Sequence, residues 1–149
     1  MLGSTFRRKA LVLLLTSVTL PLMVGCATGR AEASAEHEHS ELKQRAEAYW
    51  GYIKSNDRLG AWKLEAASKD RSITLEGYLK RGGIVYDSIE VRKVLRIDGD
   101  DSEVDVRMQY SVPSIRVKGV QVEVRDRWRK IDGEWFHVLP SNPLFSTAG

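Results

Sequence analysis

Two residues near the end of the chain, Asp126 and His137, could together act as a general acid and base. Asp126 interrupts an alternation in which every second position from Val120 to Trp128 is otherwise apolar. A carboxylate among apolar neighbours is expected to have a raised pKa, which suits a group that takes up and returns a proton. If Asp126 instead lies at the rim of the sheet, it would pair with a neighbouring Arg or Lys.

The distance between these two side chains depends on the turn that joins their strands. Asp132-Gly133 is typical of a two-residue hairpin turn, which would place Trp128 opposite His137 and leave Asp126 a diagonal neighbour of His137 on the same face. A three-residue turn with a bulge would pair Arg127 with His137 and separate the two side chains. The sequence leaves both arrangements open.

The single cysteine, Cys26, follows a segment with the layout of a secretory signal. Basic residues at positions 7–9 precede an apolar run that is too short to span a membrane, which needs about 20 residues. Residues 22–26 resemble the cleavage and lipidation site of bacterial lipoproteins. The resemblance implies removal of residues 1–25, lipidation of Cys26 and attachment to the bacterial cell envelope. Ala27 resembles the pattern for sorting to the outer membrane, facing the periplasm. An ordinary signal peptide with an incidental cysteine is the alternative.

The charge balance gives no support for a nucleic-acid partner. The chain has 23 Lys and Arg residues against 20 Asp and Glu residues, and positions 7–9 account for the difference of three. A mature net charge near zero offers no general attraction for phosphates. With Cys26 lipidated, no thiol remains for a disulfide, a nucleophile or a metal site. We expect no cofactor.

The mature chain is expected to divide into two parts. Residues 26–40, the lipidated cysteine and the stretch behind it, contain no large apolar residue and are expected to form a flexible tether. His37 and His39 could bind a transition metal, but their Glu neighbours favour a solvated polar segment, so no metal site is predicted. Residues 41–145 are expected to fold as one domain with one core.

Helical periodicity dominates the first half of this domain. Residues 42–53 carry apolar side chains at the spacing of one helix face, with Ser40 as the expected N-cap. A second helix is predicted over residues 58–67. A third is predicted after Ser72 and is expected to end at Gly82-Gly83.

Beyond Gly83 the apolar period changes to two, which predicts long strands. The following strands are predicted over residues 104–112, 120–128 and 135–139. Helices followed by antiparallel strands with one polar face indicate an α+β fold, with the N-terminal helices packed on a curved antiparallel sheet. The core face of the first strand is expected to hold Ile89, Val91, Leu95 and Ile97.

This order of elements resembles the nuclear transport factor 2-like superfamily, also called cystatin-like or SnoaL-like, over residues 41–140. The matching features are Tyr49-Trp50 on the first helix, Trp62 on the second, and the hairpin from Trp128 to Trp135. The resemblance implies a cone-shaped domain whose aromatic residues wall an apolar ligand pocket. Core packing is the alternative role for each of these aromatic residues. The candidates for the pocket are Tyr49, Trp50, Trp62, Tyr86, Trp128 and Trp135.

These observations favour a non-enzymatic binding module, tethered to the membrane through Cys26, for a small apolar ligand or an envelope protein. Pairing of two copies as a homodimer is a further option. A lyase or isomerase that uses Asp126 with His137 is the main alternative. A third interpretation is a structural subunit of an envelope complex, with the convex face of the sheet as its interface. The superfamily contains enzymes, ligand carriers and scaffold domains, so the fold alone does not choose among them.

Overall fold

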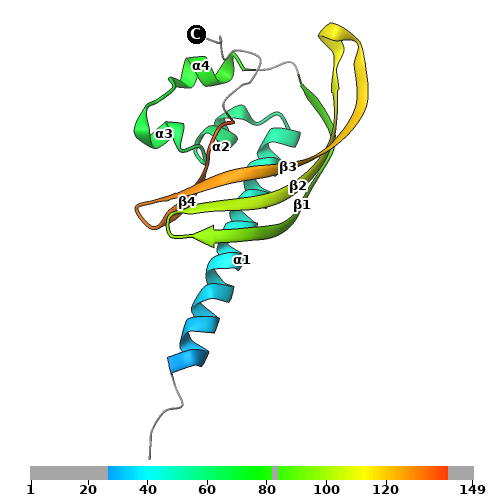
Figure 1. Cartoon of the computed structure of the whole chain (residues 1–149). Helices are drawn as coiled ribbons and strands as arrows, with labels where there is room; N and C mark the ends of the chain where they lie inside the picture. The colour runs from blue at the N-terminus through cyan, green and yellow to red at the C-terminus, as the bar shows by residue number, and fades with distance from the viewer. Residues whose placement is uncertain (1–26, 82–83, 141–149) are drawn as a thin grey trace, which may run out of the picture.

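Helix α1 (Ala27–Lys54) lies against a four-stranded antiparallel sheet in the computed structural model, which describes residues 27–81 and 84–140 (Figure 1). The α+β arrangement expected from the order of helical and strand periodicity is confirmed. Cys26 and the signal segment, the expected helix stop at residues 82–83 and the end of the expected domain at residue 145 lie outside the described residues.

The predicted apolar face of α1 is the face that packs on the sheet. Its buried side chains include Tyr49 and Trp50, on successive positions of one helix face. The helix begins earlier than expected, because residues 27–40 are helical and Ser40 lies inside α1 rather than at its N-cap. This stretch is rich in Ala and Glu, which favour helix without any need for burial. His37 Nε2 also lies 3.3 Å from Glu41 Oε1, one helical turn along, and this side-chain contact supports the helix.

The expected second helix over residues 58–67 is divided. Helix α2 (Arg58–Trp62) is followed by a turn and then by α3 (Ala67–Asp70). Between them, His137 donates its backbone N–H to the carbonyl of Leu64 at 2.8 Å, and Ala66 donates to the carbonyl of His137 at 2.8 Å. These bonds replace helical ones, so residues 64–66 bridge to β4 between the two helices. The third helix, α4 (Leu75–Leu79), begins after Ser72 as expected.

The strands follow one another in the sheet in chain order: β1 (Val85–Asp98), β2 (Asp101–Val112), β3 (Val117–Ile131) and β4 (Glu134–His137). A short 3-10 helix, η1 (Pro113–Ile115), connects β2 to β3. The alternation predicted for β2 and β3 is confirmed. The side chains that it places on the core face are buried at the centre of the sheet, among them Val104, Val106, Met108, Asp126 and Trp128.

The prediction for the core face of β1 is wrong at Leu95, which is 39% exposed. The pairing of β1 with β2 shifts register between Val91 and Lys93 and again between Val94 and Arg96. Each shift inserts an extra residue and moves the following side chains to the other face. Val94 therefore packs against the core in the place that strict alternation assigns to Leu95.

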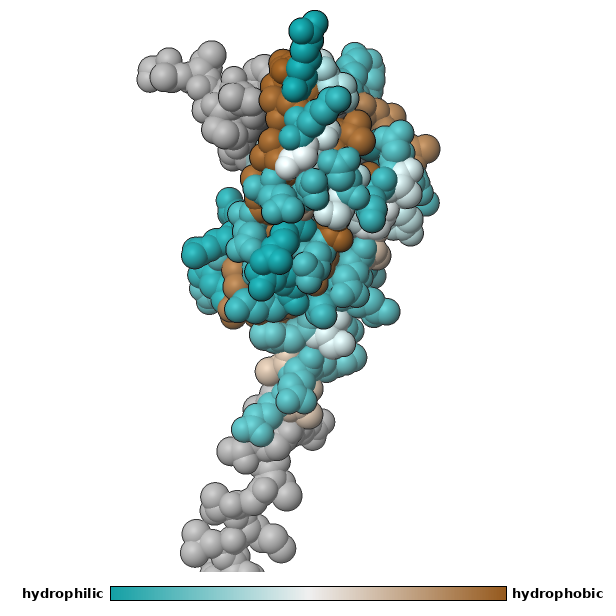
Figure 2. Space-filling view, turned by 90° about the vertical axis from the view of Figure 1, so that its right-hand side faces the viewer, coloured by the Kyte–Doolittle hydropathy of each residue, from teal (hydrophilic) through white to brown (hydrophobic). Residues whose placement is uncertain are grey.

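Hydrophobic side chains reach the surface around the connection between β2 and β3. Figure 2 shows them gathered in the upper part of the molecule, where this connection lies in Figure 1, while hydrophilic residues cover the lower part. Ile115 in η1 and Val85 at the start of β1 are among the exposed ones. None of the helices in the described ranges is both long and apolar enough to cross a membrane.

Candidate functional site

Asp126 and His137 meet in the interior, at the centre of a network of hydrogen bonds. Asp132 and Gly133 both have positive φ angles, 51° and 84°, and form the two-residue turn between β3 and β4. Trp128 is accordingly the partner of His137, as the two-residue turn predicts, and Asp126 lies diagonally beside it. His137 Nε2 lies 2.8 Å from Asp126 Oδ1.

A third residue, Glu65, holds the opposite side of the imidazole ring. Its Oε2 lies 2.9 Å from His137 Nδ1, and its Oε1 accepts a hydrogen bond of 2.7 Å from the hydroxyl of Tyr49. The backbone bonds between residues 64–66 and β4 place Glu65 beside His137. Sequence reasoning missed Glu65, although a charged residue between Leu64 and Ala66 is a local signal that could have been followed.

Two indole groups complete the surroundings of Asp126. Trp50 Nε1 and Trp128 Nε1 each donate to Asp126 Oδ2 at 2.9 Å. Asp126 is therefore not a rim residue paired with Arg or Lys, which was the alternative from the sequence. Its carboxylate replaces an apolar residue in the alternation because two buried indole donors and one imidazole require an acceptor at this position.

The hydrogen bonds fix the number of protons in the network. An indole N–H can only donate, so Asp126 Oδ2 accepts from both tryptophans. Each of the two contacts of His137 also needs one proton, because two facing lone pairs would repel. Glu65, His137 and Asp126 thus share two protons and carry a net charge of −1, wherever each proton resides. Burial by itself lowers the pKa of His137, but the carboxylates of Asp126 and Glu65 raise it to about 9.

The network is sealed by aromatic rings. Glu65 is 0% exposed, His137 2% and Asp126 6%. The ring of Tyr49 stacks on His137 with centroids 4.1 Å apart. The rings of Trp50 and Trp128 stand in T-shaped contact with the His137 ring, with centroid distances of 5.9 and 5.7 Å. Burial, followed by the charge of Glu65, raises the pKa of Tyr49 well above its usual value.

The other aromatic candidates for a ligand pocket also pack against protein. Trp62 contacts Tyr78 at a centroid distance of 5.1 Å, and Tyr86 contacts Trp50 at 6.0 Å. The centre of the sheet is thus filled by side chains of the chain itself. Trp135 is buried too, but it borders a groove beside α1.

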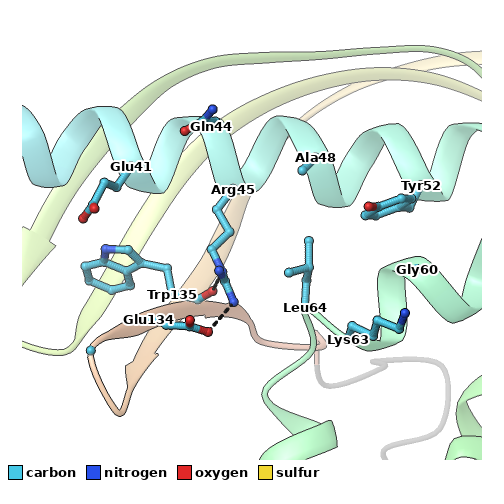
Figure 3. A pocket seen from close by; sticks show the side chains of 11 residues that line it. Glu41, Gln44, Arg45, Ala48, Tyr52, Gly60, Lys63, Leu64, Glu134 and Trp135 are labelled. Atoms are coloured by element: carbon cyan, nitrogen blue, oxygen red, sulfur yellow. Dashed lines mark hydrogen bonds and ion pairs between the residues drawn. The ribbon is translucent and has the colours of Figure 1, made fainter.

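This groove, drawn in Figure 3, lies between α1, the end of α2 and the turn that leads into β4. Its volume is about 520 Å³. Arg45 crosses the middle of the groove from α1 to β4, and its guanidinium donates to the carbonyl of Trp135 and, at 3.0 Å, to Glu134 (Figure 3). The remaining lining is mixed in character: Glu41, Gln44, Ala48, Tyr52, Gly60, Lys63, Leu64 and Gly133.

The groove can therefore hold a molecule that is partly apolar and partly polar. Ala48 and Leu64 face each other across it, and Lys63 supplies a cation at the end near Tyr52 (Figure 3). Within residues 27–81 and 84–140, no group of three or more His, Cys, Asp and Glu side chains has the arrangement of a metal site.

Comparison with protein-family models found no match to this chain, and comparison with the sequences of curated proteins found none either.

Proposed function

We propose that this chain is a lipoprotein of the bacterial cell envelope, anchored through Cys26, whose folded domain is a non-enzymatic binding module of the nuclear transport factor 2-like type. The groove between α1, α2 and the β3–β4 turn is its ligand site. The anchor is inferred from the sequence around Cys26, and the fold type from the order of helices and strands.

The observation that carries the non-enzymatic assignment is the burial of the network around His137. Every polar atom of Glu65 and Asp126 already has a partner within the chain, and both nitrogens of His137 face carboxylates. A catalytic acid or base must reach the proton that it transfers, within hydrogen-bond distance of the substrate. His137 is 2% exposed, and both of its ring nitrogens already have hydrogen-bond partners. It is therefore better suited to joining α1, β3 and β4 than to catalysis.

The groove supports binding because its lining is both apolar and charged. Ala48, Leu64 and Tyr52 offer apolar contact, while Lys63 offers a charge for an acidic group. The ligand class is therefore a small amphipathic molecule with an apolar chain and an acidic head. Its volume of about 520 Å³ lies in the range that is typical of small-molecule sites.

The test uses lauric acid and 1-dodecanol as probes, with binding followed by NMR chemical-shift changes of backbone amides. Both probes should shift residues that line the groove, and the acid should bind more tightly. Ala48→Trp fills the groove and should weaken binding of both at least tenfold. Glu47→Trp is the matched control, because Glu47 is the exposed neighbour of Ala48 on α1 and does not line the groove.

Lys63→Ala separates the two parts of the proposal, since it should weaken binding of the acid and leave 1-dodecanol unchanged. If Ala48→Trp and Glu47→Trp bind both probes as the unsubstituted chain does, the groove is not the ligand site. If neither probe binds the unsubstituted chain, the small amphipathic ligand is wrong.

A further inference from the structure

Strand β3 has one edge that is unpaired along much of its length in the described residues. β4 pairs with β3 only between Trp128 and Ile131, and the amide of Val138 adds one bond to the carbonyl of Arg127. From Val120 onward, the pairing of β3 with β2 on its other side continues without a register shift. The edge between Val120 and the start of β4 is therefore regular.

The opposite edge of the sheet is different. The pairing of β1 with β2 shifts register three times, at Tyr86/Ser88, Val91/Lys93 and Val94/Arg96. Bulges of this kind twist an edge strand and protect it from pairing with another chain. Of the two edges, that of β3 is the one with the geometry to accept a further strand.

The backbone bonds identify which residues of β3 face this edge. Val138 donates to the carbonyl of Arg127 on the open side, whereas Lys130 donates to the carbonyl of Asp100 on the side of β2. These directions alternate along a strand. The backbone groups that face the open edge therefore belong to the odd-numbered residues Gln121, Glu123 and Arg125.

The side chains select a register for a second copy of the same strand. If two β3 strands pair antiparallel with the two-fold axis at Val124, Glu123 of each copy lies opposite Arg125 of the other. The pairing therefore contains two Glu–Arg pairs. Both residues face the open edge, so each such pair can exchange two backbone hydrogen bonds. Moving the axis to Glu123 or to Arg125 would set like charges opposite each other, which destabilises a sheet.

This register also extends the charge pattern that already crosses the sheet. Within one copy, Arg107 lies opposite Glu123 and donates to it at 2.6 Å, and Asp105 lies opposite Arg125. Joining two copies at Val124 gives a row in which the sign alternates at every strand. The row consists of Glu90, Arg107 and Glu123 of one copy, followed by Arg125, Asp105 and Lys93 of the other.

We propose that two copies of this chain associate through the free edge of β3, in an antiparallel pair centred on Val124, to form one continuous eight-stranded sheet. The partner is a second copy because the edge is complementary to itself in this one register. Val124, half-buried on the core face of the sheet, is covered by its counterpart.

Disulfide cross-linking of the full chain, purified in mild detergent and oxidised with copper–phenanthroline, tests the register. Opposite residues that do not exchange hydrogen bonds have Cα atoms about 4.5 Å apart, within disulfide range. Val124→Cys should therefore give a covalent dimer. Glu123→Cys and Gln121→Cys are matched controls on the same strand, and neither faces itself in this register. The unsubstituted chain controls for Cys26.

Charge reversal tests the complementarity by a second route. Arg125→Glu faces Glu123 of the partner and should weaken dimerisation at least tenfold in sedimentation equilibrium. Arg127→Glu, two residues along on the same exposed face, lies where Val138 already occupies the edge, and should change it by less than threefold. A monomeric unsubstituted chain overturns the proposal. So does equal cross-linking of Glu123→Cys and Val124→Cys, or an equal effect of the two charge reversals.

Discussion

Tyr49 stacks on His137 with the two rings 19° from parallel, and its hydroxyl donates to Glu65, the residue that also holds His137 Nδ1. One residue of α1 thus contacts both the face of the imidazole and one of its carboxylate partners. This relationship ties α1 to β4 and to the turn after α2. The charged network therefore acts at the junction of three elements.

Removing the imidazole should strongly destabilise the fold. His137→Ala leaves Glu65 and Asp126 buried without the group between them, and breaking a buried ion pair typically costs about 3–5 kcal/mol. Urea unfolding followed by tryptophan fluorescence measures the loss. His39→Ala, at an exposed position of α1, is the control and should change stability by less than about 0.5 kcal/mol. A loss below about 1 kcal/mol for His137→Ala would argue against an ionised network.

The stability of the protein should fall as the pH rises from about 6.5 to 9. The pKa of His137 is raised to about 9 in the folded state, above the value of about 6.5 for an unfolded chain. The folded state therefore binds the proton more tightly, and this stabilisation is complete below pH ~6.5 and lost as the pH passes 9. The groups that face the ring are Glu65 and Asp126, with Tyr49 stacked on it.

Urea midpoints measured across this pH range test the linkage, and the decline should amount to about 3 kcal/mol. The same series on His37→Gln is the control, because His37 is exposed and its loss should leave the slope unchanged. A stability that is constant or rises between pH 6.5 and 9 would show that the folded network does not hold the second proton.

Trp128 should contribute both packing and a hydrogen bond. Trp128→Ala removes a ring that is almost fully buried, which costs about 3–5 kcal/mol. Trp128→Phe keeps most of the ring and removes the indole donor to Asp126, so it should cost about 1–3 kcal/mol. Chemical denaturation distinguishes the two contributions. Equal losses for both variants would mean that the bond to Asp126 carries the whole effect.

Cys26→Ser should abolish lipid attachment and normal processing, because the serine lacks the thiol that the lipoprotein pathway modifies. Labelling of cells with radioactive palmitate and fractionation of membranes measure the change. Thr28→Ser, close by and conservative, should be labelled and processed as the unsubstituted chain is. Membrane partitioning and processing that are the same in Cys26→Ser would refute the lipoprotein assignment.

Periodicity predicted the elements in which burial repeats regularly. The apolar face of α1 over residues 42–53 and the core faces at the centres of β2 and β3 each follow one period, so the pattern of residue types matches the pattern of burial. β1 departs from it because its bulges change which face a residue occupies. The local sign of this is Lys93, a charged residue at a position that strict alternation assigns to the core face. The helical conformation of residues 27–40 is not predicted by periodicity, because Ala and Glu favour helix there through intrinsic propensity without burial.

The candidate site was predictable only where its residues share a hairpin. Asp126 and His137 lie on adjacent strands, and the Asp132-Gly133 turn fixes their register. Glu65 joins them from a segment 72 positions away from His137, through a parallel bridge that replaces part of an expected helix. A long-range contact of this kind leaves no periodic trace in the local sequence. The groove likewise depends on the positions of three elements at once.

Helix α1 continues well beyond the sheet on its N-terminal side (Figure 1). If Cys26 is held in a bilayer, the first 15 residues of this helix form a rod of about 20 Å, at ~1.5 Å per residue. A rod fixes the height and tilt of the domain, whereas a loose chain allows the domain to sample every orientation. Along this rod the first contacts with the sheet are those of Glu38 with Lys130 and of Arg45 with β4, so a force on the anchor would reach them before the bonds of Tyr49 and Trp50 to Glu65 and Asp126.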